Sequence, residues 1–147
     1  MRDVEPGSVD VVIVDSTDPV GPAEGLFALD FYRDAMAALG EGGIIVQQSE
    51  SPLLHTDTII KDIHGDMRKA GLDHVQTLAF PQPVYPTGWW SCTMGSKENP
   101  LKYFREEDAV NRPFVTRYYN RGVHQGALAM PQFMVDALED EVRPEEG

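Results

Sequence analysis

The sequence predicts an α/β fold built on a largely parallel sheet. Short apolar, β-branched runs alternate along the chain with segments whose apolar residues recur at helical spacing. The apolar runs are nearly continuous rather than alternating, which is typical of strands buried on both faces of a helix-covered sheet. With 147 residues, the chain is long enough to form one domain with a substantial core.

The first half of the chain contains two predicted strands and one helix. The first strand spans residues 9–14. After a segment rich in proline and glycine, a helix is predicted over residues 31–39 with Asp30 as its N-cap, because apolar residues recur every three or four positions. Three glycines within residues 40–43 are expected to end this helix, and residues 43–48 predict a second buried strand.

The second half contains another helix and two more strands. A helix is predicted over residues 58–70, ending at Gly71, and a third strand over residues 74–80. The loop 81–88 contains three prolines and is too short for a helical crossover, so the fourth strand, 88–97, is expected to pair antiparallel with the third. The predicted order is β-α-β-α-β-loop-β. Near the end of the chain, residues 133–138 form an amphipathic segment.

The bulk composition excludes several classes of function. The net charge of −12, from 24 acidic and 12 basic residues, disfavours a nucleic-acid partner. It suits a cationic ligand, although an acidic surface also serves solubility. The single cysteine, Cys92, excludes an intrachain disulfide and suits a reducing compartment. No apolar stretch approaches the ~20 residues that span a bilayer, and the first residues do not resemble a signal peptide, so a cytoplasmic location is expected.

Two aspartates directly follow the first predicted strand. Asp15 and Asp18 lie three positions apart, and Pro19, Gly21 and Pro22 follow them. Neighbouring carboxylates hold cations, and one of them can act as a base. The prolines and the glycine suit a loop with one or two defined shapes, such as a lid. The alternative, which remains open at this point, is that both aspartates only shape a turn.

Polar residues also follow the next two predicted strands. Gln48 and Glu50 end the second strand, and Tyr85 lies in the loop after the third. Because ligands of α/β sheets bind beyond the carboxyl ends of the strands, these side chains and the two aspartates are expected at one rim. The alternative is that the strands simply reach solvent there. The four histidines show no metal-ligand spacing, so no metal site is predicted.

Four segments taken together resemble the spermidine synthases, the polyamine aminopropyltransferases. They are "DVVIVDSTDPVGPAEGLF", "GGIIVQQSESPLLH", "VYPTGWWSCTMGSK" and "YYNRGVHQGALAMPQF", and their order and approximate spacing also match. The resemblance implies the C-terminal half of a Rossmann-like class I methyltransferase fold. Its sheet is mostly parallel, with an antiparallel last strand.

The resemblance also implies roles for individual residues. Asp15 occupies the position of the family's proton acceptor, and Asp18 that of an acid that helps hold the diamine. Gln48 and Tyr85 match side chains that contact the amine substrate. Pro22 and Ala23, in turn, match the loop that folds over the nucleoside thioether.

The implied reaction moves an aminopropyl group from decarboxylated S-adenosylmethionine to putrescine, giving spermidine and 5′-methylthioadenosine. Decarboxylated S-adenosylmethionine is then a co-substrate, and neither a permanently bound cofactor nor a metal is expected. The sulfonium is already a good leaving group, so catalysis consists mainly of orienting the attacking amine.

Two parts of the family pattern have no counterpart in this sequence, namely the N-terminal β-domain and the glycine-rich nucleoside-binding half. Residues 1–140 are therefore expected to be a partial catalytic domain, and residues 141–147 an acidic tail. The isolated chain is expected to be inactive, with its first strand at an exposed sheet edge. Expected partners are the diamine and either a second copy or the missing N-terminal half.

Two other interpretations remain. The first is a non-catalytic truncated or split subunit. The second is a class I S-adenosylmethionine-dependent methyltransferase, which the sequence disfavours: residues 18–21 read Asp-Pro-Val-Gly and lack the aromatic residue of a D/N-P-P-Y motif.

Overall fold

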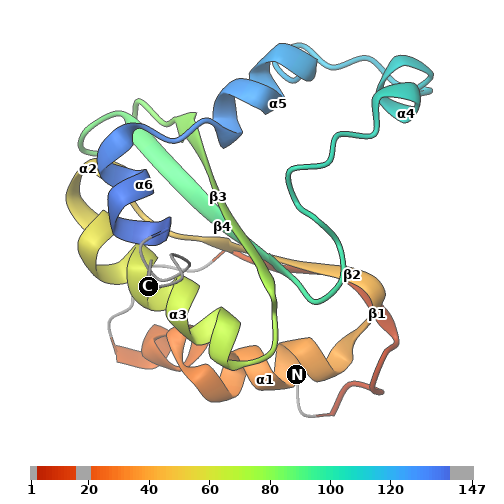
Figure 1. Ribbon diagram of the computed structural model, residues 1–147, viewed down its shortest axis with the longest axis vertical. Helices are drawn as coiled ribbons and strands as arrows, with labels where there is room; N and C mark the ends of the chain where they lie inside the picture. Colours follow the sequence, from red (N-terminus) through yellow and green to blue (C-terminus); the bar gives the residue numbers. More distant parts are fainter. Residues whose placement is uncertain (1–2, 16–20, 140–147) are drawn as a thin grey trace, which may run out of the picture.

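The computed structural model describes residues 3–15 and 21–139, which form one four-stranded sheet and the helices around it (Figure 1). The order of elements agrees with the prediction as far as the fourth strand. In chain order the elements are β1 (Val9–Val14), the 3-10 helix η1 (Gly21–Phe27), α1 (Leu29–Ala38), β2 (Leu39–Gln48), α2 (Pro52–His55), the π-helical turn η2 (Thr56–Ile60), α3 (Lys61–Lys69), β3 (His74–Pro81), β4 (Trp89–Ser96), α4 (Glu106–Val110), α5 (Arg121–Leu128) and α6 (Gln132–Glu139).

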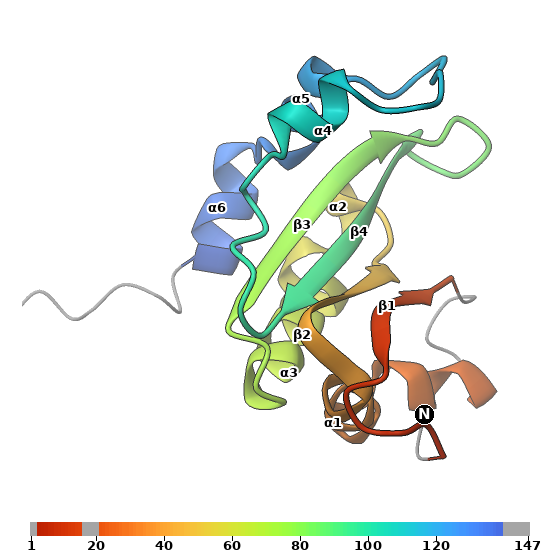
Figure 2. The same ribbon diagram turned by 90° about the vertical axis from the view of Figure 1, so that its right-hand side faces the viewer.

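The last strand is inserted into the sheet rather than added at its edge. The spatial order is β1-β2-β4-β3, with β1 parallel to β2 and β4 antiparallel to both of its neighbours (Figure 2). The prediction of an antiparallel last strand is therefore confirmed. Strands β1, β2 and β3 all point the same way, so their carboxyl ends open on one rim together with the beginning of β4.

Three predicted element boundaries were wrong. Asp30 is not the N-cap of α1, which begins at Leu29 with Ala28 as its N-cap. The glycines at 40–43 do not end α1, which stops at Ala38; they lie inside β2 as a bulge, between the pairs Val9–Leu39 and Val11–Ile44. The helix predicted over residues 58–70 is part of a longer run that begins at Pro52 and passes through the π-helical turn η2. Proline is favoured in the first turn of a helix because its missing N–H would have no partner there.

The main core lies between the sheet and the helices α1 and α3, which Figure 1 shows together on one side of the sheet. Val12 and Val14 of β1 point into this core. Val11 and Ile13 point away from it and are 53% and 75% exposed, so the expected burial of this strand on both faces was wrong. In the described part of the chain β1 and β3 are the two edge strands of the sheet.

A second, smaller core lies between η2 and the C-terminal helix. Met134, Ala137 and Leu138 of α6 pack against the buried Ile60, which confirms the amphipathic segment at residues 133–138. The short helices α4 and α5 were not predicted. No residue of α4 or α5 is buried. No helix in residues 3–15 and 21–139 is long and apolar enough to cross a membrane.

Polar groups also lie inside the main core. The imidazole Nε2 of His64, on α3, is 2.7 Å from the hydroxyl of Thr77 on β3, and both residues are buried. Burial, and secondarily the charge of Arg68, lowers the pKa of His64 from 6.5 to about 3. The folded protein therefore holds this imidazole neutral across most of the acidic range.

This pKa shift predicts a specific acid sensitivity. The unfolded chain takes up the proton near pH 6.5 and the folded chain near pH 3, so the stabilisation is complete above pH 6.5 and is lost as the pH falls toward 3. In His64→Gln the pH dependence of the free energy of unfolding should flatten in this window, by up to about 1.4 kcal/mol per pH unit. Urea titrations at several pH values measure the free energy of unfolding and hence its pH dependence. His124→Gln, on α5 outside the main core, is the matched control, and an unchanged slope in His64→Gln would contradict the assignment.

Candidate active site

A cavity of about 400 Å³ opens at the rim where the three parallel strands end. Asp15, Gln48 and Tyr85 all line it, together with Trp90 and Cys92 of β4. The structure thus brings together three of the residues that the sequence singled out. Asp18 lies outside the described residues. Pro22 and Ala23 lie in η1, and the structure describes their backbone but not their side chains.

The cavity is on the sheet face opposite α1 and α3. Gln48 and Cys92 are direct partners in the β2–β4 pair, so their side chains leave the same face. Trp90 lies two residues before Cys92 on β4, so its side chain leaves that face too. The sequence alone does not assign Trp90 and Cys92 to the site, because that assignment requires the register between β2 and β4.

Asp15 directly follows β1 and is exposed. Its carboxylate influences Cys92 on the cavity floor: burial, and secondarily the negative charge of Asp15, raises the pKa of the Cys92 thiol to about 11. The thiol is therefore protonated at neutral pH and unsuited to act as a nucleophile. Asp15 is the anionic group of this cavity that reaches solvent.

Gln48 lines the cavity and carries an acceptor without a hydrogen-bond partner. Its Nε2 donates a hydrogen bond to Oε1 of Glu50 at 3.1 Å. Its own Oε1 is buried and accepts no hydrogen bond from the described residues. A buried carbonyl oxygen without a donor is rare in folded proteins, so this atom is ready to accept from a ligand.

Tyr85 lies in the loop between β3 and β4. Its ring stacks at a tilt on Trp90, with 4.7 Å between the ring centroids. The loop is closed by hydrogen bonds from Gln82 N to Gly88 O at 2.9 Å and from Gly88 N to Tyr85 O at 3.1 Å. Thr87 takes a left-handed conformation, with φ of 72°. These contacts hold the phenol at the mouth of the cavity, where it is 49% exposed.

The turn after β2 is held by buried hydroxyls. Ser91 Oγ donates to the backbone oxygen of Glu50 at 2.8 Å and lies 2.9 Å from Ser49 Oγ, and Thr93 Oγ1 donates to Ser49 Oγ at 3.0 Å. Glu50 is only 3% exposed and has a φ of 68°. The sequence placed Glu50 at the rim but gave no signal that its carboxyl group would be buried beside Gln48.

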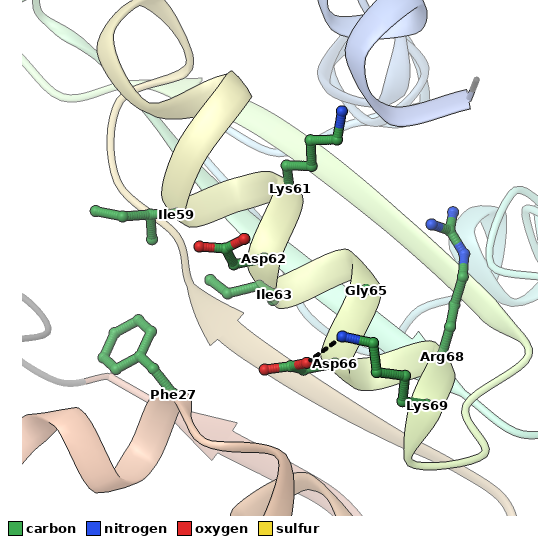
Figure 3. A pocket seen from close by; sticks show the side chains of 9 residues that line it. All are labelled: Phe27, Ile59, Lys61, Asp62, Ile63, Gly65, Asp66, Arg68 and Lys69. Carbon is green, nitrogen blue, oxygen red and sulfur yellow. Dashed lines mark hydrogen bonds and ion pairs between the residues drawn. The ribbon is translucent and has the colours of Figure 1, made fainter. Parts of the chain in front are cut away.

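A second cavity, of about 480 Å³, lies on the other side of the molecule between Phe27 and the outer face of α3 (Figure 3). Its polar side chains carry charges of both signs, and Lys69 is paired with Asp66 at 3.0 Å (Figure 3). None of the described site candidates lines it. The smaller rim cavity is therefore the better candidate for chemistry, because its charged and polar groups converge on one opening.

Comparison with known proteins points to one family. Residues 1–105 match the family model of the spermine/spermidine synthase domain. The chain is 56% identical over 133 residues to the polyamine aminopropyltransferase of Thioalkalivibrio sulfidiphilus, covering 90% of this chain and 47% of that protein. It is 55% identical over 134 residues to the enzyme of the same name from Halorhodospira halophila, covering 91% and 48%. The chain thus spans about half the length of these relatives.

Solved structures agree with this assignment and with the predicted fold. A crystal structure of spermidine synthase in complex with the transition state analogue AdoDATO superposes with a TM-score of 0.83 at 31% identity, over 93% of this chain and 46% of that one. Spermidine synthase from Thermotoga maritima gives a TM-score of 0.80 at 30% identity, over 93% and 45%. The chain therefore belongs to the spermine/spermidine synthase family.

Proposed function

We propose that this chain forms the amine-acceptor side of a polyamine aminopropyltransferase. The observation that carries the proposal is the rim cavity, which combines the Asp15 carboxylate, the unsatisfied Oε1 of Gln48 and the Tyr85 phenol. A carboxylate, a carbonyl oxygen and a phenol oxygen all accept hydrogen bonds, which suits a ligand that only donates them, such as an alkylammonium.

The reaction is the transfer of an aminopropyl group from decarboxylated S-adenosylmethionine to putrescine. The amine nitrogen attacks the aminopropyl carbon next to the sulfonium; the new C–N bond forms as the C–S bond breaks, and 5′-methylthioadenosine leaves. An alkylamine with a pKa near ~10.4 is protonated at neutral pH and cannot attack until it loses a proton. The names of the relatives and the neighbour's transition state analogue support this assignment.

Asp15 is the proposed proton acceptor. Because its carboxylate reaches solvent at the cavity mouth, it can hold the ammonium and then take up and release the proton. Gln48 would accept a hydrogen bond from the same amine, and Tyr85 would fix the direction of attack. The Tyr85–Trp90 stack offers an aromatic wall for the methylene chain of the diamine.

Further roles follow from the family alone. Asp18 is proposed to hold the diamine with Asp15, and Pro22 and Ala23 to cover the nucleoside thioether. Residues 1–140 are proposed to be a partial catalytic domain that works in the cytoplasm. It would work with a second copy or with the N-terminal half of the family's fold, which supplies the rest of the nucleoside site.

A second candidate function is that of a non-catalytic subunit. Diamine binding is common to both candidates. Turnover in the presence of the N-terminal half of the family's fold separates them, because a non-catalytic subunit would give none.

The first prediction concerns diamine binding. The chain should bind 1,4-diaminobutane, and Asp15→Asn should weaken this binding about tenfold or more, because an ammonium loses its ionised partner. Isothermal titration calorimetry measures both affinities.

Asp10→Asn is the matched control, since it removes the same charge from the other end of β1. It should leave the affinity within about twofold. Equal losses in the two variants would show that the net charge of the protein, not the cavity, attracts the diamine.

The second prediction concerns turnover. With 1,4-diaminobutane and decarboxylated S-adenosylmethionine, the chain alone should release no 5′-methylthioadenosine above the uncatalysed rate, because the family's glycine-rich nucleoside-binding loop has no counterpart in this sequence. Chromatography of the reaction mixture measures the product. Release at an ordinary enzymatic rate would show that these residues suffice for both substrates, and would exclude the non-catalytic subunit.

A further inference from the structure

The amide of Gln48 has two possible orientations with opposite chemistry. Its oxygen and nitrogen are nearly equal in size, so packing alone scarcely distinguishes the two orientations. With the oxygen toward the cavity, the side chain accepts a hydrogen bond from an ammonium. With the nitrogen toward the cavity, it presents a donor to another donor and repels the ligand. Something must therefore select the first orientation.

Glu50 is placed to make this selection. Its Oε1 accepts the hydrogen bond from Gln48 Nε2 at 3.1 Å, and an ionised carboxyl group accepts hydrogen bonds but donates none. A flipped Gln48 would place its carbonyl oxygen next to the carboxylate oxygen of Glu50, so two acceptors would face each other. This contact is unfavourable because Glu50 is only 3% exposed and water cannot separate the two oxygens. The remaining amide atom, Oε1, is then the buried acceptor that faces no donor among the described residues.

The backbone explains how a carboxyl group two residues beyond Gln48 can turn back to it. Glu50 has a φ of 68°, in the left-handed region that non-glycine residues seldom adopt. The strained conformation is secured by Ser91, whose hydroxyl donates to the backbone oxygen of Glu50 at 2.8 Å. Strain of this kind persists only where the surroundings hold it in place.

We propose that Glu50 is a positioning residue: it fixes the amide of Gln48 so that the carbonyl oxygen points at the amine substrate. The inference rests on the proposed function, since it assigns the amine to the rim cavity. Glu50 itself acts through Gln48 and is not expected to touch the substrate.

The first test reads the orientation directly, without ligand. In the ¹H–¹⁵N spectrum, the side-chain NH₂ of Gln48, assigned by its loss in Gln48→Met, should show one proton shifted downfield and slow to exchange. Glu50→Met should abolish both features. If the Gln48 NH₂ protons exchange as fast as those of exposed glutamines in the unmodified protein, the proposed hydrogen bond is absent and the inference is wrong.

The second test is a double-mutant cycle on 1,4-diaminobutane binding, followed by NMR titration. Glu50→Met leaves Gln48 Nε2 without an acceptor, and a buried N–H group without a partner is tolerated less well than a buried carbonyl oxygen without one. The flipped amide then becomes the favoured state, and the affinity should fall about tenfold. Glu50→Gln still accepts from Nε2 in one of two arrangements, so it should cost only about twofold. In the Gln48→Met background, Glu50→Met should have no further effect.

The controls separate positioning from charge. If Glu50 acted only through its negative charge, Glu50→Gln and Glu50→Met would weaken binding equally, and the effect would persist in the Gln48→Met background. Either result would overturn the inference while leaving the proposed function intact. Failure of the unmodified chain to bind 1,4-diaminobutane would instead overturn the proposed function. Glu41→Met, an exposed site at the other end of β2, controls for the loss of one charge, and thermal melts confirm that each variant folds.

Discussion

A row of buried hydroxyl groups holds the inserted strand β4 in place, and the site depends on it. Thr77 of β3 lies 2.9 Å from Thr93 of β4; Thr93 donates to Ser49, and Ser49 lies 2.9 Å from Ser91, again on β4. Each hydroxyl both donates and accepts, so the row satisfies its polar atoms internally. Because buried polar groups are costly when unpaired, the row favours one register of β4 over its neighbours.

The same row reaches from the core to the rim. Its last member, Ser91, fixes the backbone of Glu50, and next to that residue Ser51 lies 2.8 Å from Thr87 of the β3–β4 loop. Two non-glycine residues of the described part of the chain have left-handed backbones: Thr87 is a partner in this hydrogen bond, and Glu50 directly precedes the other partner, Ser51. The turn that carries the Gln48–Glu50 pair and the loop that carries Tyr85 are coupled, so neither side of the rim cavity is positioned independently of the other.

The sequence predicted the strands well because their apolar β-branched runs are short and separated by turn residues. It also placed Asp15, Gln48 and Tyr85 at one rim, because parallel strands share their carboxyl edge. The predicted burial of Val11 and Ile13 was wrong, because a continuous apolar run does not reveal whether anything covers the second face of its strand. The proposed role of Glu50 depends on a left-handed φ and on a hydroxyl 41 residues away, and neither is visible as a local pattern.

The adjacent residues Trp89 and Trp90 are intrinsic fluorophores that lie in different environments. Trp90 is 8% exposed and stacks on Tyr85 at the rim cavity, whereas the ring of Trp89 meets Phe133 of α6 edge to face, with 6.4 Å between centroids. Because neighbouring residues of a strand face opposite sides, the indole of Trp90 reports on the rim cavity and the indole of Trp89 reports on the packing of α6. Emission from Trp89→Phe and Trp90→Phe variants would therefore resolve ligand entry from movement of α6, with no label attached.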